Sequence, residues 1–343
     1  MGGRRELAPA TNMSDVAHRA GVSIATVSRA LRGVPGVSGT TRERVLQIAD
    51  ELAYVISPEA SRLARQVTGR VAVVVPKIDV WFYAAMLSSL ETELRAADLD
   101  VLVYQVDGRV QRSRFFRDLP ARRKVDAVIL IALPLLAEEE QRLDLLGVSV
   151  VVAGGRIRDL PHVLVDDHDA AVRAVGHLVG LGHTRIAMIR TSDTDGTAWS
   201  SDILRRQGYQ DILARHGLSV PDEYLVTRPF GVRAGGDAMA ALLDVPTPPT
   251  AVFAYSDELA VGAFRTAIDR GLRIPADLSI VGVDGNPLAE LFGITTVTQF
   301  VAEQGRLAGR MAIAMLRGES PGEYVLVPSE LVVRASTGPV PAG

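Results

Sequence analysis

The sequence predicts two parts of different fold class: a small all-α module at the N-terminus, and an α/β core of two doubly wound parallel-sheet lobes. Three observations support this division. Apolar residues recur at helical spacing up to residue 52, β-branched runs alternate with amphipathic segments from residue 71 onward, and this alternation occurs in two successive series. A chain of 343 residues is long enough for two or three separately packed units.

Composition narrows the class of protein. Apolar residues make up 48% of the chain, yet they form no run long enough to span a membrane, and no apolar stretch follows the N-terminal arginines as a secretory signal requires. The chain has no cysteine, which rules out disulfides, thiolate zinc sites and cysteine nucleophiles. We therefore expect a soluble protein of the reducing cytoplasm.

The formal net charge of −3 hides an asymmetry along the chain. Residues 1–70 carry ten arginines against six acidic residues, a balance of +4 that leaves −7 on the remainder. A basic N-terminal arm on an acidic body suits a protein that contacts phosphate at one end only.

A helix-turn-helix unit is predicted between residues 12 and 31. Asn12 and Asp15, three positions apart, form a helix-capping pair, Gly21 makes the turn, and Ser23 caps a second helix. Val27 and Leu31 of this second helix are predicted to face inward, and a third helix, capped by Ser38, completes the module. The outward side of the second helix consists of Ile24, Ala25, Ser28 and Arg29, and the third helix contributes the apolar stripe Val45, Ile48 and Leu52.

A short hinge follows the module over residues 57–70. Ser57 is a good N-cap, Pro58 suits the first helical turn, and Glu59 favours the positive end of a helix dipole. The helix would have about two turns, which is marginal alone in water. It either needs a partner to order it or is a solvated linker.

Buried parallel strands are predicted in the core wherever short β-branched runs occur. Ligands bind at the carboxyl ends of such strands, so two facing lobes make a cleft. The first series has strands at 71–75, 101–104, 127–131 and 148–152, with helices near 83–97, 111–119 and 138–146, and the second has strands at 185–189, 251–254 and 278–283.

The N-terminal module, residues 12–56, resembles the DNA-binding headpiece of the lac-repressor and galactose-repressor family. This resemblance implies that the second helix enters the major groove, where Arg29 reads a guanine while Thr26 and Ser28 touch phosphate. The matching residues are Asp15-Val16-Ala17, Ala20-Gly21-Val22-Ser23, Ala25-Thr26-Val27-Ser28-Arg29, Val37-Ser38, Thr41-Arg42-Glu43-Arg44-Val45 and Tyr54.

The same resemblance gives the hinge a function. In the resembled family this segment orders only on operator DNA, pairs with its dimer mate and inserts a leucine into the minor groove; Leu63 stands at that position. Ile56, Ser57 and Ser61 depart from the family's usual proline, asparagine and arginine. The DNA contacts that the resemblance implies are Ser23, Ile24, Ala25, Thr26, Ser28, Arg29, Tyr54, Ser57, Leu63 and Ala64.

The core, residues 71–337, resembles the family's effector-binding and dimerisation core, which is similar to periplasmic sugar-binding proteins. We expect a first lobe of about residues 71–165 and 296–325, and a second of about 166–295 and 326–337. The matching landmarks are Val165-Asp166-Asp167, His177-Leu178, Leu181-Gly182-His183-Thr184-Arg185-Ile186-Ala187, Arg205, Gly208-Tyr209, Ser256-Asp257-Glu258-Leu259-Ala260-Val261-Gly262-Ala263 and Ile280-Val281-Gly282-Val283-Asp284.

A cleft for a small polyol needs carboxylates, an arginine fork and aromatic faces. Asp284 and Arg205 match the family's ligand-binding aspartate and arginine, and we expect both to contact the effector; the alternatives are a turn cap for Asp284 and a surface pair with Asp202 or Asp211 for Arg205. Ser256 and Gly285 depart from the family's frequent asparagine and second acid. The expected effector-binding residues are Asp79, Phe82, Tyr83, Arg205, Phe230, Ser256 and Asp284.

These observations together predict a homodimeric, sequence-specific repressor that binds double-stranded operator DNA and responds to a sugar-like effector. The effector acts either as an inducer or as a corepressor. A free-standing sugar-binding protein and a sugar-processing enzyme remain rival hypotheses. We expect no catalytic residue and no cofactor, since phosphate-loop and nucleophile-elbow motifs are missing, and no metal site, with His177 and His183 structural.

Overall fold

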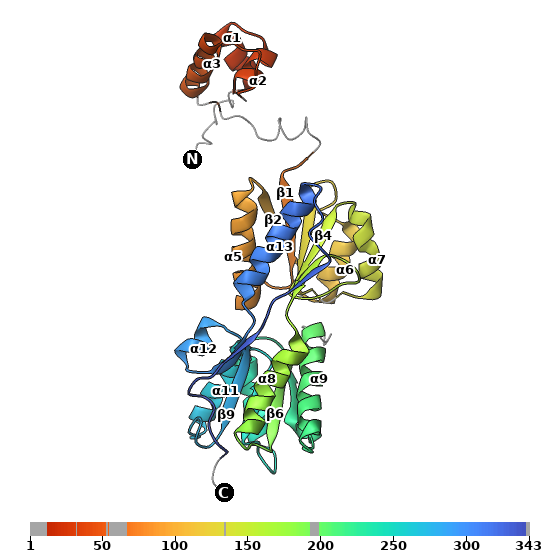
Figure 1. The fold of residues 1–343 in the computed structure, drawn as a ribbon, viewed down its shortest axis with the longest axis vertical. Coiled ribbons are helices and arrows are strands. Elements are labelled where there is room, and N and C mark those ends of the chain that lie inside the picture. Colours follow the sequence, from red (N-terminus) through yellow and green to blue (C-terminus); the bar gives the residue numbers. More distant parts are fainter. Residues whose placement is uncertain are drawn as a thin grey trace, which may run out of the picture. The chain divides into compact units, whose positions relative to one another are not determined.

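The computed structural model describes residues 12–31, 33–52, 54, 67–133, 135–192 and 199–340. The chain divides into two compact units, Met1–Thr68 and Gly69–Gly343. The first unit contains a three-helix module, and the second consists of two α/β lobes (Figure 1).

The three helices of the first unit are α1 (Met13–Ala20), α2 (Ile24–Leu31) and α3 (Gly39–Glu51). The predicted capping pair starts α1: Asn12 Oδ1 accepts the Ser14 N–H at 2.8 Å, and Asp15 Oδ2 accepts the Asn12 N–H at 2.8 Å. Gly21 ends α1 at φ 64°, the left-handed conformation that glycine adopts without strain. One small core unites the helices; its buried members are Val16, Ala17, Ala20, Val27, Ala30, Val45 and Ala49.

The first lobe is built on a six-stranded parallel sheet in the order β11-β5-β4-β3-β1-β2. Helices α5 (Trp81–Ala96) and α13 (Val301–Leu316) cover one face, and α6 (Gly108–Asp118) and α7 (Ala137–Leu143) cover the other. The strands are β1 (Arg70–Val75), β2 (Asp100–Gln105), β3 (Ala127–Ile131), β4 (Ser149–Ala153), β5 (His162–Leu164) and β11 (Tyr324–Leu326), and a 3-10 turn (Asp144–Leu146) follows α7.

The second lobe has the sheet order β12-β10-β9-β8-β6-β7, parallel except for β12 against β10. Helices α10 (Val232–Leu243) and α11 (Asp257–Asp269) cover one face, and α8 (Asp167–Gly180) and α9 (Ser200–Arg215) cover the other. The remaining elements are β6 (Ile186–Thr191), β7 (Leu225–Arg228), β8 (Ala251–Ala254), β9 (Ser279–Asp284), β10 (Thr295–Thr298), β12 (Glu330–Val332), α12 (Pro287–Leu291) and a 3-10 turn (Asp222–Tyr224).

The predicted lobe boundary at residue 296 is wrong by a few residues. The β-branched run of β10 pairs with β9 in the second lobe, with Thr295 opposite Val281 and Thr298 opposite Asp284. The chain therefore crosses to the first lobe only after β10. It returns after β11, since Val327 is still buried in the first lobe's core, two residues beyond the predicted return at 325.

The predicted strands are all found, but the run 101–104 is wrong as a buried strand: it forms the edge strand β2, where Val103 is 44% exposed. The other runs are buried, because a β-branched run buried on both faces has few alternatives to a central parallel strand. Within the ranges that the structure covers, none of the helices combines the length and apolar character needed to cross a bilayer.

Helices α10 and α11 approach so closely that glycine is required at their contact. A Cβ on Gly262 of α11 would lie 1.8 Å from the carbonyl oxygen of Val232, and one on Gly235 of α10 would lie 2.1 Å from that of Leu259. Backbone atoms cannot move aside as a flexible side chain can, so these two helices depend on the missing methyl groups.

We therefore expect Gly262→Ala to destabilise the core by about 3 kcal/mol or more, because the added methyl overlaps backbone atoms. Gly180→Ala is the matched control, since nothing lies within 4 Å of a Cβ at this last residue of α8. Urea unfolding followed by circular dichroism measures both variants. Equal midpoints for the two would contradict the packing argument.

Candidate functional site

The outward side of α2 lies where the sequence predicts it. Val27 is fully buried and Leu31 half-buried, whereas Ala25 and Arg29 are exposed and Ile24 is 51% exposed. Ile24 and Arg29 are thus both in solvent, Ile24 at the start of the helix and Arg29 near its end. The helix therefore presents a short mixed apolar and cationic face.

Among the polar residues of this helix-turn-helix, Ser23 caps a helix and the others lie wholly or partly at the surface. Ser23 Oγ accepts the Thr26 N–H at 3.1 Å and lies 2.9 Å from the Thr26 hydroxyl, so Ser23 caps α2 as predicted. Ser28 is half-buried. Tyr54 packs partly buried against the core of the module, and its N–H donates to the Ala49 carbonyl at 2.8 Å. The remaining predicted DNA contacts, Ser57, Leu63 and Ala64, lie outside the described residues, as does most of the hinge.

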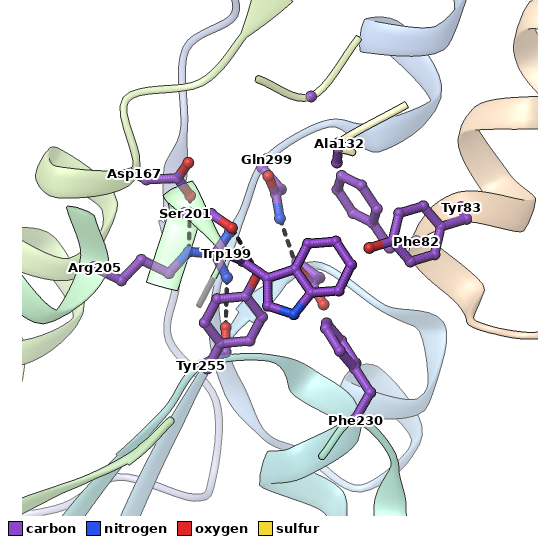
Figure 2. A pocket seen from close by; sticks show the side chains of 12 residues that line it. Phe82, Tyr83, Ala132, Asp167, Trp199, Ser201, Arg205, Phe230, Tyr255 and Gln299 are labelled. Carbon is purple, nitrogen blue, oxygen red and sulfur yellow. Dashed lines mark hydrogen bonds and ion pairs between the residues drawn. The ribbon is translucent and has the colours of Figure 1, made fainter. Parts of the chain in front are cut away.

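A cavity lies between the two lobes of the core (Figure 2). Five of the predicted effector-binding residues line it, two from the first lobe and three from the second. The lining residues are Phe82, Tyr83, Ala132, Gly154, Asp167, Trp199, Ser201, Arg205, Phe230, Tyr255, Asp284 and Gln299.

Two predicted effector-binding residues are not among the lining residues. Asp79 is exposed and follows β1 without reaching the cavity wall. Ser256 is buried, and its Oγ accepts the Leu259 N–H at 3.3 Å as the N-cap of α11. The structure gives its hydroxyl a capping role.

Several lining residues were missed, although a general signal exists for most of them. Tyr255 directly follows β8, Gln299 directly follows β10, and Ala132 and Gly154 directly follow β3 and β4. Residues at the carboxyl ends of parallel strands are the expected cleft residues, so this rule would have found all four. Trp199 does not directly follow a strand, so this rule would not have found it.

Arg205 is held by a buried network rather than by either predicted surface partner. Its Nε donates to Asp167 Oδ1 at 2.8 Å and its Nη1 donates to the Tyr255 carbonyl at 2.5 Å, while the guanidinium lies 4.4 Å from the Tyr255 ring centroid. Asp202 instead pairs with Arg190, and Asp211 contacts His168. Because Arg205 is only 3% exposed, its charge needs this compensation.

Asp284 is a buried carboxylate at the end of β9 without a cation in hydrogen-bond contact among the described residues. Its Oδ1 accepts the Gln299 Nε2–H at 2.6 Å, and its backbone has φ 132°, a strained value for a residue other than glycine. Burial raises the pKa of Asp284 well above its usual range, and the nearby charge of Asp257 raises it further. Burial likewise raises the pKa of Asp257 to about 7, although the backbone N–H that Asn286 donates to this carboxylate at 2.8 Å acts to lower the pKa.

Aromatic rings form the rest of the cavity wall. Phe82 packs edge-on against Tyr83 at 5.3 Å between ring centroids, and Phe230 packs edge-on against Tyr255 at 5.6 Å. Figure 2 shows the indole of Trp199 between these two pairs. Aromatic faces beside a carboxylate, a guanidinium, an amide and a hydroxyl are suited to a small ligand with both apolar and polar edges.

One hydrogen bond joins the lobes close to this cavity. Glu258 of α11 accepts the backbone N–H of Trp81, the first residue of α5, at 3.2 Å. Val80, the N-cap of α5, supplies no side-chain bond, so a carboxylate of the other lobe caps this helix. The contact depends on how closely the lobes approach.

The two histidines that were predicted to be structural are tied into the second lobe. His183 is fully buried, with its ring nitrogens 3.0 Å from the Thr250 hydroxyl, the Ser279 hydroxyl and the Gly338 carbonyl. His177 contacts the Thr337 hydroxyl at 2.9 Å. In the described parts of the chain, no three His, Cys, Asp or Glu side chains are grouped so that they could hold a metal ion.

A helix-turn-helix module with an exposed α2 face, on a chain whose two-lobed core encloses a polar and aromatic pocket, is the architecture of a ligand-regulated DNA-binding protein. Comparison with known families agrees. A model of bacterial regulatory proteins of the lacI family matches residues 12–57, and a model of the periplasmic binding protein-like domain matches residues 175–337.

Comparison with whole proteins extends this match along the chain. The HTH-type transcriptional repressor CytR of Escherichia coli (strain K12) is 34% identical over 337 residues, which cover 97% of this chain and 98% of CytR. A transcriptional regulator CelR–cellobiose complex superposes with a TM-score of 0.71 at 29% identity, covering 95% of this chain and 99% of the other. The chain therefore belongs to the LacI family of bacterial transcriptional regulators.

The fold is also similar to that of the lac repressor. The structure of the lac repressor dimer bound to operator and the anti-inducer ONPF has a TM-score of 0.85, covers 96% of this chain and 100% of its own, and is 24% identical in sequence. At this identity the likeness defines the fold alone.

Two buried carboxyls of the second lobe, Asp257 and the pocket residue Asp284, predict how stability depends on pH. A carboxyl whose pKa is raised in the folded chain binds its proton more tightly there, so its stabilising effect is present at low pH and lost as pH rises; for Asp257 the window runs from about 4 to about 7. We expect Asp284→Asn to raise the melting temperature by about 3 °C or more at pH 8, because it removes a buried charge, and to raise it less at pH 5.

The control for this prediction is Asp277→Asn. A hydrogen bond from Arg273 lowers the pKa of the half-buried Asp277 to about 2, so the stabilising contribution of the Asp277 carboxylate is present at neutral pH and this variant should not be stabilised. The melting temperatures of both variants and of the wild type are measured by circular dichroism at pH 5 and pH 8. A gain for Asp284→Asn that is the same at pH 5 and pH 8 would show that Asp284 keeps its ordinary pKa.

Proposed function

We propose that the chain is a homodimeric repressor that binds a near-palindromic operator and is controlled by a small carbohydrate in the pocket between its lobes. The observation that carries this proposal is the presence, in one chain, of an exposed α2 face and a pocket walled by both lobes. CytR, at 34% identity, is named a repressor, and CelR is solved with cellobiose.

On DNA, α2 occupies the major groove. Arg29 presents a guanidinium that matches the two acceptors of a guanine edge, while Ile24 and Ala25 present apolar surface to a thymine methyl group. Thr26, Ser28 and the Ser23 cap lie at positions suited to phosphate. Tyr54, Ser57, Leu63 and Ala64 complete the contact from the chain that follows α3.

In the pocket, the polar residues hold the ligand and the rings cover it. Asp284 accepts from sugar hydroxyls, Arg205 donates, and Phe82, Tyr83 and Phe230 cover apolar ring faces. No catalytic role and no cofactor is assigned, because CytR and CelR are both named as transcriptional regulators. Since the partner is chromosomal DNA, the protein acts in the bacterial cytoplasm, at the nucleoid.

The ligand acts by changing which arrangement of the lobes is populated. The bond from Trp81 to Glu258 and the ring contact between Tyr83 and Trp199 both cross from one lobe to the other, so a ligand seated among these side chains favours one lobe arrangement. An inducer favours the arrangement that releases DNA, and a corepressor favours the other.

An exposed apolar patch on the second lobe is suited to dimerisation. It lies on α12 and the end of α11, where Leu291 is 77% exposed and the Phe264 and Phe292 rings pack 6.0 Å apart. Contiguous apolar surface of this kind is typical of subunit interfaces. The patch comprises Ile268, Leu288, Leu291 and Phe292.

We expect Arg29→Ala to weaken binding to an operator upstream of the protein's own gene by about 1–3 kcal/mol and to relax specificity at one base pair, because a bidentate guanine contact is lost. Gel-shift titration with the operator and with single-base variants measures both effects. D-glucose and cellobiose, added to the wild-type complex, test for release.

The control is Arg19→Ala, on α1, whose exposed ion pair with Glu51 contributes little. Equal weakening on every DNA sequence would make Arg29 a phosphate contact only. A sugar that binds the protein but leaves operator affinity unchanged would favour a sugar-binding protein, and a sugar that is consumed would favour an enzyme.

We expect Leu291→Glu to convert the dimer to a monomer, because it places a charge in the centre of an apolar interface. Sedimentation measures the mass, and binding to a palindromic operator should weaken at least tenfold. Val110→Glu is the control, since Val110 is 80% exposed on α6, outside the patch. A Leu291→Glu dimer as stable as wild type would refute this interface.

A further inference from the structure

We propose that Trp199 determines which effector the pocket accepts, by donating its indole N–H to an acceptor oxygen of an uncharged, hydroxyl-bearing ring compound. The inference rests on the proposed function, because it assigns the ligand of the same pocket. Trp199 immediately precedes α9, lines the cavity, and is only 6% exposed.

The indole nitrogen of Trp199 is buried and has no hydrogen-bond partner among the residues that the structure describes. Figure 2 shows it in the middle of the ring cluster, directed toward the space between Tyr255 and Phe230. A buried donor left unpaired is costly, and a ligand that brings an acceptor removes this cost. The N–H therefore selects for an acceptor.

The Trp199 ring also contacts both lobes. Its centroid lies 6.4 Å from that of Tyr83 in the first lobe and 6.1 Å from that of Phe230 in the second. A ligand bonded to the indole is therefore held where the lobes meet. Because of this position, a ligand that contacts Trp199 affects how the two lobes are arranged.

Charge in the pocket favours an uncharged ligand. Asp167 balances the charge of Arg205 at 2.8 Å, and burial raises the pKa of Asp284, which keeps that carboxyl toward its neutral form. An anion or a cation would therefore enter a pocket that offers no opposite charge to compensate it, and burying an uncompensated charge is costly.

The remaining polar groups suit a ligand that both donates and accepts hydrogen bonds. Asp284 Oδ1 already accepts from Gln299, and the second oxygen of this carboxyl donates when protonated and accepts when ionised, while Trp199 Nε1 can only donate. A hydroxyl group both donates and accepts, and ring C–H groups lie against aromatic faces. Polyhydroxylated rings satisfy all three requirements together.

The chain offers a direct reporter, because its only two tryptophans are Trp81 and Trp199. Trp81→Phe leaves Trp199 as the sole indole and keeps the backbone N–H that Glu258 accepts. The probes are D-glucose, D-ribose, cellobiose and adenosine as uncharged hydroxylated rings, choline as a cation and D-galacturonate as an anion. Emission of the Trp81→Phe protein is titrated with each probe.

We expect a saturable change in Trp199 emission with at least one uncharged probe and none with choline or D-galacturonate. Trp199→Phe should weaken that probe about five- to tenfold in calorimetry, because one hydrogen bond is lost. Monodeoxy analogues of the probe supply a test that leaves residue 199 unchanged. One analogue should lack the hydroxyl that accepts from Trp199, so it should bind the Trp81→Phe protein as weakly as the full probe binds Trp199→Phe. The affinity of this analogue should not fall further in Trp199→Phe.

Three results would overturn the assignment. Choline or D-galacturonate could bind in preference to every uncharged probe, or the probe could bind Trp199→Phe with full affinity. The third is that every deoxy analogue loses as much affinity on Trp199→Phe as the full probe does, so that the two losses add. Operator release separates the two proposals. If a probe releases the operator equally well from Trp199→Phe, this inference fails while the proposed function stands. If a probe depends on Trp199 but never alters operator binding, the inference stands and the proposed function fails.

Discussion

The buried ion pair between Arg205 and Asp167 is the interaction on which the pocket depends. It joins the start of α8 to the middle of α9, and Arg205 also donates to the carbonyl of Tyr255, at the end of β8. Removing either charge would leave the other buried and uncompensated. Three elements of the second lobe are thus fixed relative to one another before any ligand arrives.

This fixed side of the pocket carries the charged groups together with the rings of Trp199, Phe230 and Tyr255, and the first-lobe side carries the rings of Phe82 and Tyr83. Asp284, held by Gln299 at the crossover after β10, stands opposite Phe82 and Tyr83 at the start of α5. The lobes meet through ring contacts and the bond from Trp81 to Glu258, which are weak one by one. Weak contacts between two rigid bodies allow a small ligand to shift their arrangement.

The N-terminal module, in contrast to the core, presents an exposed surface and not an enclosed pocket. Its small core of alanines and valines leaves Ile24 and Arg29 in solvent, so it keeps one surface for another molecule. The chain therefore separates two tasks physically: an exposed cationic and apolar face on one unit, and an enclosed pocket on the other.

The sequence alone determined the local features. Asn12 with Asp15, Gly21 and Ser23 mark the helix-turn-helix because capping and turn chemistry act over three or four residues, and β-branched runs mark the core strands because few other structures bury them on both faces. Only the tertiary structure decided the partner of Arg205 and the place of Trp199. These depend on which surfaces meet once two sheets have formed, and contacts between residues far apart in the chain leave no periodic trace in it.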